Sequence, residues 1–280
     1  MGEEDVWDGR IVMGSDSVQD KVNNWLREEG YSLEMQVARV FCEKKFDVLQ
    51  SDYYVDQDTG EQRELDVWAS RKAPPLSIGV CVECKSTKGK PWVVFRGASV
   101  PTGFMPWSGY ATSPLARIFL GIVGGRQDAR KTLVCHPPAC VGYSLRPAFK
   151  GPDNAYEAVF QAVKGAAAKA PPTSGMAAIG IPAIVIDGRL YEAFLDDDGN
   201  PQTEEVACSA VLWRQKLAGV VQPLIHVVTL KGLSALVDEL DIGIRFLLSM
   251  CSQDLEQAKA RELRVRQRQG RRISFTEPDR

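Results

Sequence analysis

The chain has 280 residues, enough to bury a substantial core in one elaborate domain or two small ones. Its 44% hydrophobic and 25% charged residues are ordinary for a globular protein, and the formal net charge of −2 gives no overall attraction to a polyanion. The seven cysteines are too few, and odd in number, for a disulfide scaffold, so we expect most of them to be reduced thiols in the core.

The sequence predicts neither a membrane-spanning helix nor a secretory signal. Residues 1–10 are acidic and lack the basic and apolar parts of a secretory signal. The best apolar run, 115–123, is much shorter than a membrane-spanning helix and contains Arg117. We therefore expect a cytoplasmic protein that does not bind membranes.

Two helices are expected at the start of the chain. Apolar residues at helical spacing predict a short amphipathic helix over 17–29, which Gly30 ends. Ser32 is expected to cap a second helix, 33–45, in which Glu34 lies beside the apolar stripe. The stripe of the first helix consists of Val18, Val22, Trp25 and Leu26.

Three strands are expected next, over 46–55, 63–70 and 77–85. The turn residues DQDTGEQ predict that the first two form a hairpin, and RKAPPL separates the second from the third.

The second half of the chain is expected to contain both helices and strands. Asp187-Gly188 joins two β-type runs and predicts a hairpin. The segment GAAAKAPPTSG, 165–175, is typical of a linker, and the loop 97–110 carries Phe104, Trp107 and Tyr110, which either pack over the sheet or contact a ligand. The other expected elements are helices over 113–123, 154–170 and 233–248 and strands over 131–135 and 224–229.

The C-terminal segment is basic. From Lys259 to Arg272 it has seven Lys or Arg residues against one acid, Glu262. Such an arm either contacts a phosphate backbone or is a solvated helix end. We therefore expect an α/β fold, a mixed β-sheet flanked by helices, with a helical N-terminal arm over 1–30, a domain over 31–250 and a basic C-terminal tail over 251–280.

The strand 77–85 is unusual because an apolar segment ends in two opposite charges. Side chains alternate across a strand, so Val80 and Val82 share one face with Cys84, whereas Glu83 and Lys85 share the other.

The preceding strand divides in the same way. Leu65 and Val67 point away from Asp66, and antiparallel pairing would bring them into the apolar core of the next strand. Asp66 then comes to the side of Glu83 and Lys85. Two close carboxylates repel each other unless a cation lies between them, and an oxygen-preferring divalent ion such as Mg²⁺ is the usual solution.

These motifs together resemble the PD-(D/E)XK nuclease superfamily, in particular the branch near Mrr-type restriction enzymes and Holliday junction resolvases. The resemblance is carried by a helix with Glu34, by RELD ending at Asp66, and by VECK with Glu83 and Lys85. The proline of the family name is replaced by Leu65. Gln161 is the candidate for the glutamine helix motif found in the Mrr-like branch.

The resemblance implies a restriction-endonuclease-like fold and Mg²⁺-dependent hydrolysis of DNA, with Mn²⁺ as a substitute. It implies that Asp66, Glu83 and the backbone carbonyl of Cys84 hold the metal. Lys85 would position the attacking water and stabilise the phosphate charge, and Glu34 would be an accessory acid. The implied setting is prokaryotic restriction or phage defence, with recombination or repair as the alternative.

Other functions remain open on the sequence alone. The domain is also compatible with a non-catalytic binding or assembly subunit, or with a nuclease subunit whose protein partner supplies recognition, since the sequence shows no separate DNA-reading motif. A homodimer is expected because double-strand cleavage needs two active sites.

Structural roles compete with the functional ones at each position. Asp66 and Glu83 would form a surface cross-strand patch, Lys85 an ordinary ion pair, and Glu34 a favourable charge at a helix N-terminus. Zinc binding by Cys81 and Cys84 is disfavoured because residues three apart on a strand point to opposite faces. Cys135, His136 and Cys140 would complete such a zinc site.

Overall fold

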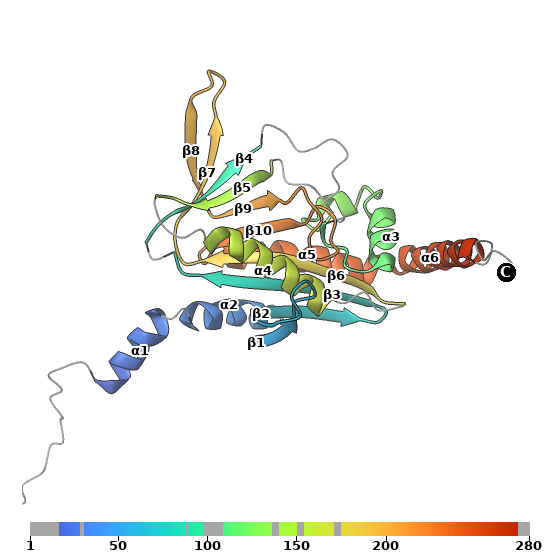
Figure 1. The fold of residues 1–280 in the computed structure, drawn as a ribbon, viewed down its shortest axis with the longest axis horizontal. Coiled ribbons are helices and arrows are strands. Elements are labelled where there is room, and N and C mark those ends of the chain that lie inside the picture. Colours follow the sequence, from blue (N-terminus) through green and yellow to red (C-terminus); the bar gives the residue numbers. More distant parts are fainter. Residues whose placement is uncertain are drawn as a thin grey trace, which may run out of the picture.

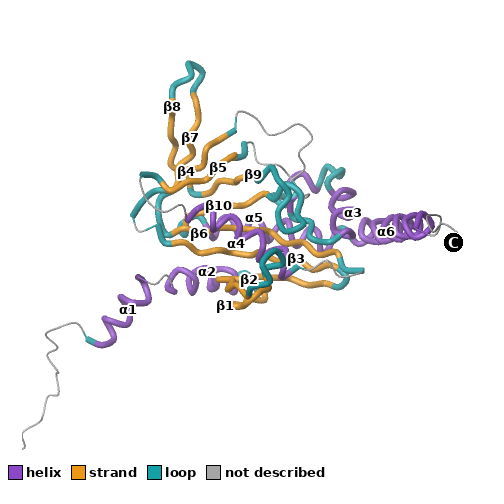
Figure 2. Tube along the Cα trace, viewed as in Figure 1, coloured by secondary structure: helices purple, strands orange, loops and turns teal. Residues whose placement is uncertain are grey.

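The computed structural model describes residues 17–28, 31–87, 89–97, 109–135, 140–149, 154–170 and 175–273. They form an α/β fold with one ten-stranded mixed sheet (Figures 1 and 2). The strands are β1 (Asp47–Val55), β2 (Gln62–Ala73), β3 (Leu76–Lys85), β4 (Trp92–Arg96), β5 (Gly142–Pro147), β6 (Ala177–Ile186), β7 (Leu190–Leu195), β8 (Pro201–Val206), β9 (Cys208–Leu212) and β10 (Leu224–Thr229). The helices are α1 (Val18–Glu28), α2 (Tyr31–Glu43), α3 (Pro114–Val123), α4 (Asn154–Lys169), α5 (Leu233–Met250) and α6 (Ser252–Ile273).

The sheet has the strand order β1-β2-β3-β6-β10-β9-β5-β4-β7-β8. Strands β1, β2 and β3 form an antiparallel meander. The chain later returns through α4 to place β6 parallel to β3, in register from Leu76 opposite Ala177 to Lys85 opposite Ile186. Strand β6 is buried along its whole length, as expected for a central strand covered on both faces.

Helices cover both faces of the sheet. On one face α2, α3, α5 and α6 bury an apolar cluster that includes Val37, Phe119 and Leu240. On the other face α4 packs on the sheet with its alanine-rich side. Gly165 allows this close approach, because a Cβ there would lie 2.7 Å from the sulfur of Cys81.

Most of the elements expected from the sequence are confirmed. Helices α2 to α5, the β1–β2 hairpin, β3 and β10 lie within a few residues of their predicted bounds. Helix α1 also forms, but Val18 is 79% exposed and Trp25 50% exposed, so its apolar stripe is not buried in a core. In Figure 1, α1 leans away from the domain. Ser32 lies within α2 rather than before it.

Three predictions about the chain path are wrong. Residues 132–135 form a bend and turn after a short 3₁₀ helix (Ala129–Lys131), where the N–H of Cys135 binds the carbonyl of Thr132. The Asp187-Gly188 turn does not close a hairpin, because β6 pairs with β3 and β10 whereas β7 pairs with β4 and β8. The first part of the expected linker belongs to α4, where Ala166 is buried.

The sequence did not predict β4, β5, β8 and β9, which with β7 extend the sheet beyond β10. Phe104, Trp107 and His136 lie outside the described residues, whereas Tyr110 is fully buried. Within the described ranges, no helix is long and apolar enough to cross a membrane.

The basic C-terminal segment is helical and forms most of α6. Leu255 and Ala258 are buried, and Asp254 accepts a hydrogen bond from Arg126 at 2.6 Å, so the first half of α6 is part of the domain. Figure 1 shows α6 at the end of the domain opposite to the C-terminal end of β3.

The burial of His226 on β10 predicts that the folded protein loses stability in acid. Its Nε2 lies 2.8 Å from the Tyr110 hydroxyl, and complete burial lowers the pKa of His226 to about 4 from a usual value near 6.5. The unfolded chain therefore takes up a proton first as the pH falls, so this contribution is present above about pH 6.5 and is lost towards pH 4. When the pH falls from 7 to 4.5, the free energy of unfolding should decrease in both proteins. The decrease in His226→Gln should be smaller than that in the wild type by on the order of 2 kcal/mol, as measured by urea denaturation. An equal loss in both proteins would contradict the assignment.

Candidate active site at the end of β2 and β3

The candidate site begins where β2 and β3 part. Their described ladder runs from Ala73 opposite Leu76 to Val67 opposite Val82, so Asp66 and Glu83 are the first residues beyond it. On the other side of β2, the ladder with β1 skips the position of Asp66, and Ser51 opposite it has a φ of +46°. Such a left-handed conformation is costly for a residue other than glycine.

The carboxylate of Asp66 is held by the backbone of the neighbouring strand. Its Oδ2 accepts a hydrogen bond of 2.6 Å from the N–H of Cys84. The N–H and C=O of one strand residue point towards the same neighbour, so the carbonyl of Cys84 also faces β2. The carbonyl of Lys85 points the other way, where it accepts from the N–H of Asp187 at 3.4 Å.

Glu83 and Lys85 lie on the face covered by α4. Their side chains form an ion pair of 2.6 Å, with Glu83 almost fully buried and Lys85 partly exposed. Lys85 Nζ also donates a hydrogen bond of 3.2 Å to Oε1 of Gln161 on α4. From the resemblance Gln161 was only a candidate for the glutamine helix motif, and the structure brings it into the same network as Glu83 and Lys85.

Glu34 approaches from the opposite face of the sheet. It lies in the first turn of α2, and its pKa is raised to about 7 by burial and then by the negative charges of Asp66 and Glu64. Helices on both faces thus contribute to one end of the sheet, α2 with Glu34 and α4 with Gln161.

Burial and repulsion disfavour the ionised forms of the acids at the site, Glu34, Asp66 and Glu83. Burial, followed by repulsion from Asp66, raises the pKa of Glu83 to about 8. Burial also raises the pKa of Asp66, against the opposing effects of the Cys84 N–H and Lys85. Burial opposes the positive charge of Lys85, but Glu83 and Asp66 outweigh it and raise its pKa. In the metal-free protein the site therefore favours uptake of a proton or a cation.

The expected packing of β2 is partly wrong. Val67 joins the cluster of Val80 and Val82 as predicted, but Leu65 packs with Trp68 and Cys81 against α4. Leu65 and Val67 therefore face opposite sides, because the strand departs from regular alternation at Asp66.

The turn after β6 supports the end of β3. Asp187 accepts hydrogen bonds of 2.8 Å from the N–H of Thr87 and from the hydroxyl of Ser86. A Cβ on Gly188 would lie 2.0 Å from Thr87 Oγ1, so glycine is required for this approach. The Asp-Gly signal thus marked a turn that supports β3, although not a hairpin.

The donor set fits a hard cation better than zinc. In the described part of the chain, no three His, Cys, Asp or Glu side chains are grouped to hold a metal ion. Mg²⁺ often takes only one or two protein carboxylates, completed by carbonyls, waters and phosphate oxygens. Asp66 and Glu83, with the Cys84 carbonyl beside them, provide such a set. Cys81 packs on the α4 face and Cys84 on the opposite one, which disfavours zinc.

Comparisons of the chain with protein-family models, curated proteins and solved structures find no match.

The raised pKa of Glu83 predicts how Glu83→Gln changes stability. Because the folded pKa of about 8 exceeds the ordinary 4.5, the stabilising contribution of Glu83 is present below about pH 4.5 and is lost as the pH rises through 8. Glutamine mimics the protonated acid. In EDTA, Glu83→Gln should therefore raise the Tm at pH 8.5 by about 3–8 °C and change it little at pH 5.

The matched control is Glu204→Gln on β8, whose side chain is exposed. It should leave the Tm unchanged at both pH values in thermal melts followed by circular dichroism. A lower Tm for Glu83→Gln at pH 8.5 would show that the ion pair with Lys85 outweighs the burial of the carboxylate.

Proposed function

We propose that this protein is a metal-dependent endonuclease that hydrolyses DNA phosphodiester bonds. The observation that carries the proposal is the position of Asp66, held by the N–H of Cys84 where β2 and β3 part, with Glu83 and Lys85 beside it. These are the residues to which the resemblance assigns catalysis. A mixed sheet flanked by helices agrees with the restriction-endonuclease-like fold that we propose for the domain.

Asp66, Glu83 and the carbonyl of Cys84 would hold the metal. When bound, a Mg²⁺ or Mn²⁺ ion would supply Lewis acidity and lower the pKa of a coordinated water. The chain fixes its own ligands in advance, because Asp66 is tied to the backbone and Glu83 is almost fully buried.

Lys85 places a positive charge where a phosphate oxygen would gain negative charge. Its ammonium group is oriented by Glu83 on one side and by Gln161 on the other. A compact cation in a partly buried site stabilises developing charge more strongly than it would in water. Gln161 is therefore a positioning residue in this proposal.

Glu34 would act as a proton acceptor near the site. Its pKa of about 7 would allow it to exchange a proton near neutral pH, and it lies on the α2 side of Asp66. A cation bound at Asp66 would lower this pKa and favour the carboxylate.

The setting of the reaction is also proposed from the resemblance, namely prokaryotic restriction or phage defence, with recombination or repair as the alternative. A protein partner or a homodimer would supply the remaining recognition. The basic helix α6 lies at the far end of the domain, so any phosphate contact there would be remote from the site. The rival function, a non-catalytic binding subunit, is distinguished by the cleavage test below.

Cleavage of nucleic acids should depend on the metal and on the three central residues. Purified protein should cut plasmid or linear DNA in Mg²⁺ or Mn²⁺ but not in EDTA. Asp66→Ala, Glu83→Ala and Lys85→Ala should each lower the rate by at least about a hundredfold. Only the two acid variants should weaken metal binding, measured by calorimetry. Cutting at the wild-type rate by either acid variant would refute the site, and no cutting by the wild type would favour the non-catalytic rival.

Loss of the Gln161 amide should slow cleavage without affecting metal binding. Gln161→Ala removes one hydrogen bond to a charged group, so we expect a rate lower by about tenfold at saturating DNA. Gln36→Ala, on the exposed face of α2, is the matched control and should cut at the wild-type rate. Equal rates for both variants would remove Gln161 from the site.

A further inference from the structure

A pocket lies on the α4 face next to the candidate site. It has a volume of about 240 Å³ and lies between α4, the end of β1 and the start of β2. Gln161 lines this pocket and also binds Lys85. A ligand in the pocket would therefore be adjacent to the proposed catalytic lysine. The other lining residues used below are Tyr54, Asp56, Arg63, Tyr156, Glu157, Phe160 and Lys164.

The pocket contains a buried hydroxyl group that lacks a partner. Tyr54 is only 5% exposed, and its OH makes no hydrogen bond. Burial raises the pKa of Tyr54, so the phenol keeps its proton and remains a hydrogen-bond donor. A buried donor without an acceptor is costly, and here an acceptor on a ligand would satisfy it.

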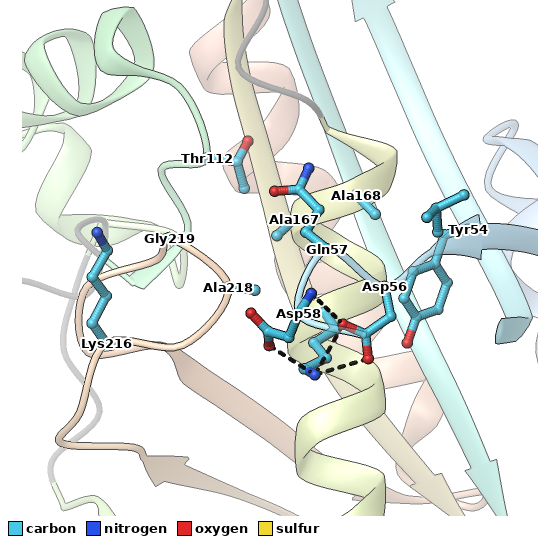
Figure 3. Close-up of a pocket in the computed structure, with 12 residues that line it drawn as sticks. Tyr54, Asp56, Gln57, Asp58, Thr112, Ala167, Ala168, Lys216, Ala218 and Gly219 are labelled. Atoms are coloured by element: carbon cyan, nitrogen blue, oxygen red, sulfur yellow. Dashed lines mark hydrogen bonds and ion pairs between the residues drawn. The ribbon is translucent and has the colours of Figure 1, made fainter. Parts of the chain in front are cut away.

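The charges of the pocket argue against an anionic ligand. Asp56 is buried and binds Lys164 Nζ at 2.8 Å and Arg63 Nε at 3.1 Å. Lys164 also binds Asp58, which lies outside this pocket, at 2.9 Å, and Glu157 is the second carboxylate that lines the pocket. A neighbouring pocket of about 310 Å³ shares Tyr54, Asp56 and Lys164 with this one, and Figure 3, a close-up of that neighbouring pocket, shows Asp56 beside Tyr54. Among the lining residues, two carboxylates balance two cations, so the pocket has no excess positive charge and favours a neutral ligand over a phosphate.

The aromatic side chains that line the pocket favour a ligand with a flat ring. The ring centroids of Tyr156 and Phe160 lie 4.6 Å apart, and both rings contact Trp213, which fixes their orientation. Tyr156 is 49% exposed and so offers a ring surface to a ligand. Nucleobases stack on such aromatic side chains.

We infer that this pocket takes one unpaired nucleobase of the substrate strand, stacked against Tyr156, with a base carbonyl accepting from the Tyr54 hydroxyl. The inference rests on the proposed nuclease function and adds a recognition element to it. Because Gln161 connects the pocket to Lys85, the base belongs to a nucleotide close to the scissile phosphate. Thymine and guanine carry a carbonyl that suits this donor, whereas adenine carries none.

The test measures binding without cleavage, so that it does not depend on activity. Fluorescence anisotropy in EDTA would compare labelled oligothymidine and oligodeoxyadenosine of about 12 nucleotides. Tyr54→Phe should weaken oligothymidine binding by about threefold to tenfold and leave oligodeoxyadenosine binding unchanged. Tyr156→Ala should weaken both by at least about fivefold.

Tyr53→Phe is the matched control, since the neighbouring Tyr53 is 57% exposed. It should bind both oligonucleotides as the wild type does. Tyr54→Phe should also keep or raise the Tm, because the hydroxyl that it removes has no partner in the protein. A lower Tm would instead assign the hydroxyl a structural partner and overturn the inference.

The outcomes separate this inference from the proposed function. Unchanged oligothymidine binding by Tyr54→Phe overturns the base pocket, even if the wild type cuts DNA and Asp66→Ala does not. A selective loss in Tyr54→Phe supports the pocket, even if no cutting is found under any condition. If the wild type binds neither oligonucleotide, the pocket is overturned, and the cleavage assay alone then decides the nuclease.

Discussion

The candidate site depends on one hydrogen bond, in which the N–H of Cys84 binds the carboxylate of Asp66 at the point where the ladder between β2 and β3 ends. This bond fixes the carboxylate without using another side chain. It also keeps β2 close to β3 beyond the end of their ladder, where Glu83 and Lys85 are paired with β6 alone. The distortion continues into β1, where Ser51 takes a positive φ opposite Asp66. Strain of this kind is typical of functional sites.

The parted strands place the site at the end of the sheet, where both helical layers reach it. Glu34 comes from α2 on one face and Gln161 from α4 on the other, and neither helix alone would provide both. Burial raises the pKa of Glu34, Asp66 and Glu83, and repulsion from Asp66 adds to this effect at Glu34 and Glu83, with Lys85 as the cation within the network. This excess of negative charge is the physical reason for proposing a divalent cation there, and hence phosphodiester hydrolysis.

Helix α4 connects the proposed chemistry with the proposed recognition. Its small residues allow it to lie close to β3 and β6, which sets the distance of its polar side chains from the site. Gln161 then reaches Lys85, and Lys164, one turn further along, reaches the buried Asp56. Tyr156 and Phe160 on the same helix form the wall of the adjacent pocket. A shift of this helix would therefore affect both sites together.

The sequence by itself determined the elements with strong periodicity and the residues of the charged motif. Alternation along 77–85 correctly placed Glu83 and Lys85 on one face, because side-chain direction in a regular strand is a local property. The same rule failed at Leu65, where the backbone departs from regular geometry. Only the tertiary structure decided that Asp187 supports β3 instead of closing a hairpin, that GAAAK continues a buried helix, and that Gln161 and Tyr54 lie near Lys85 and Glu83. These features depend on contacts between residues far apart in the chain, for which local sequence patterns carry no signal.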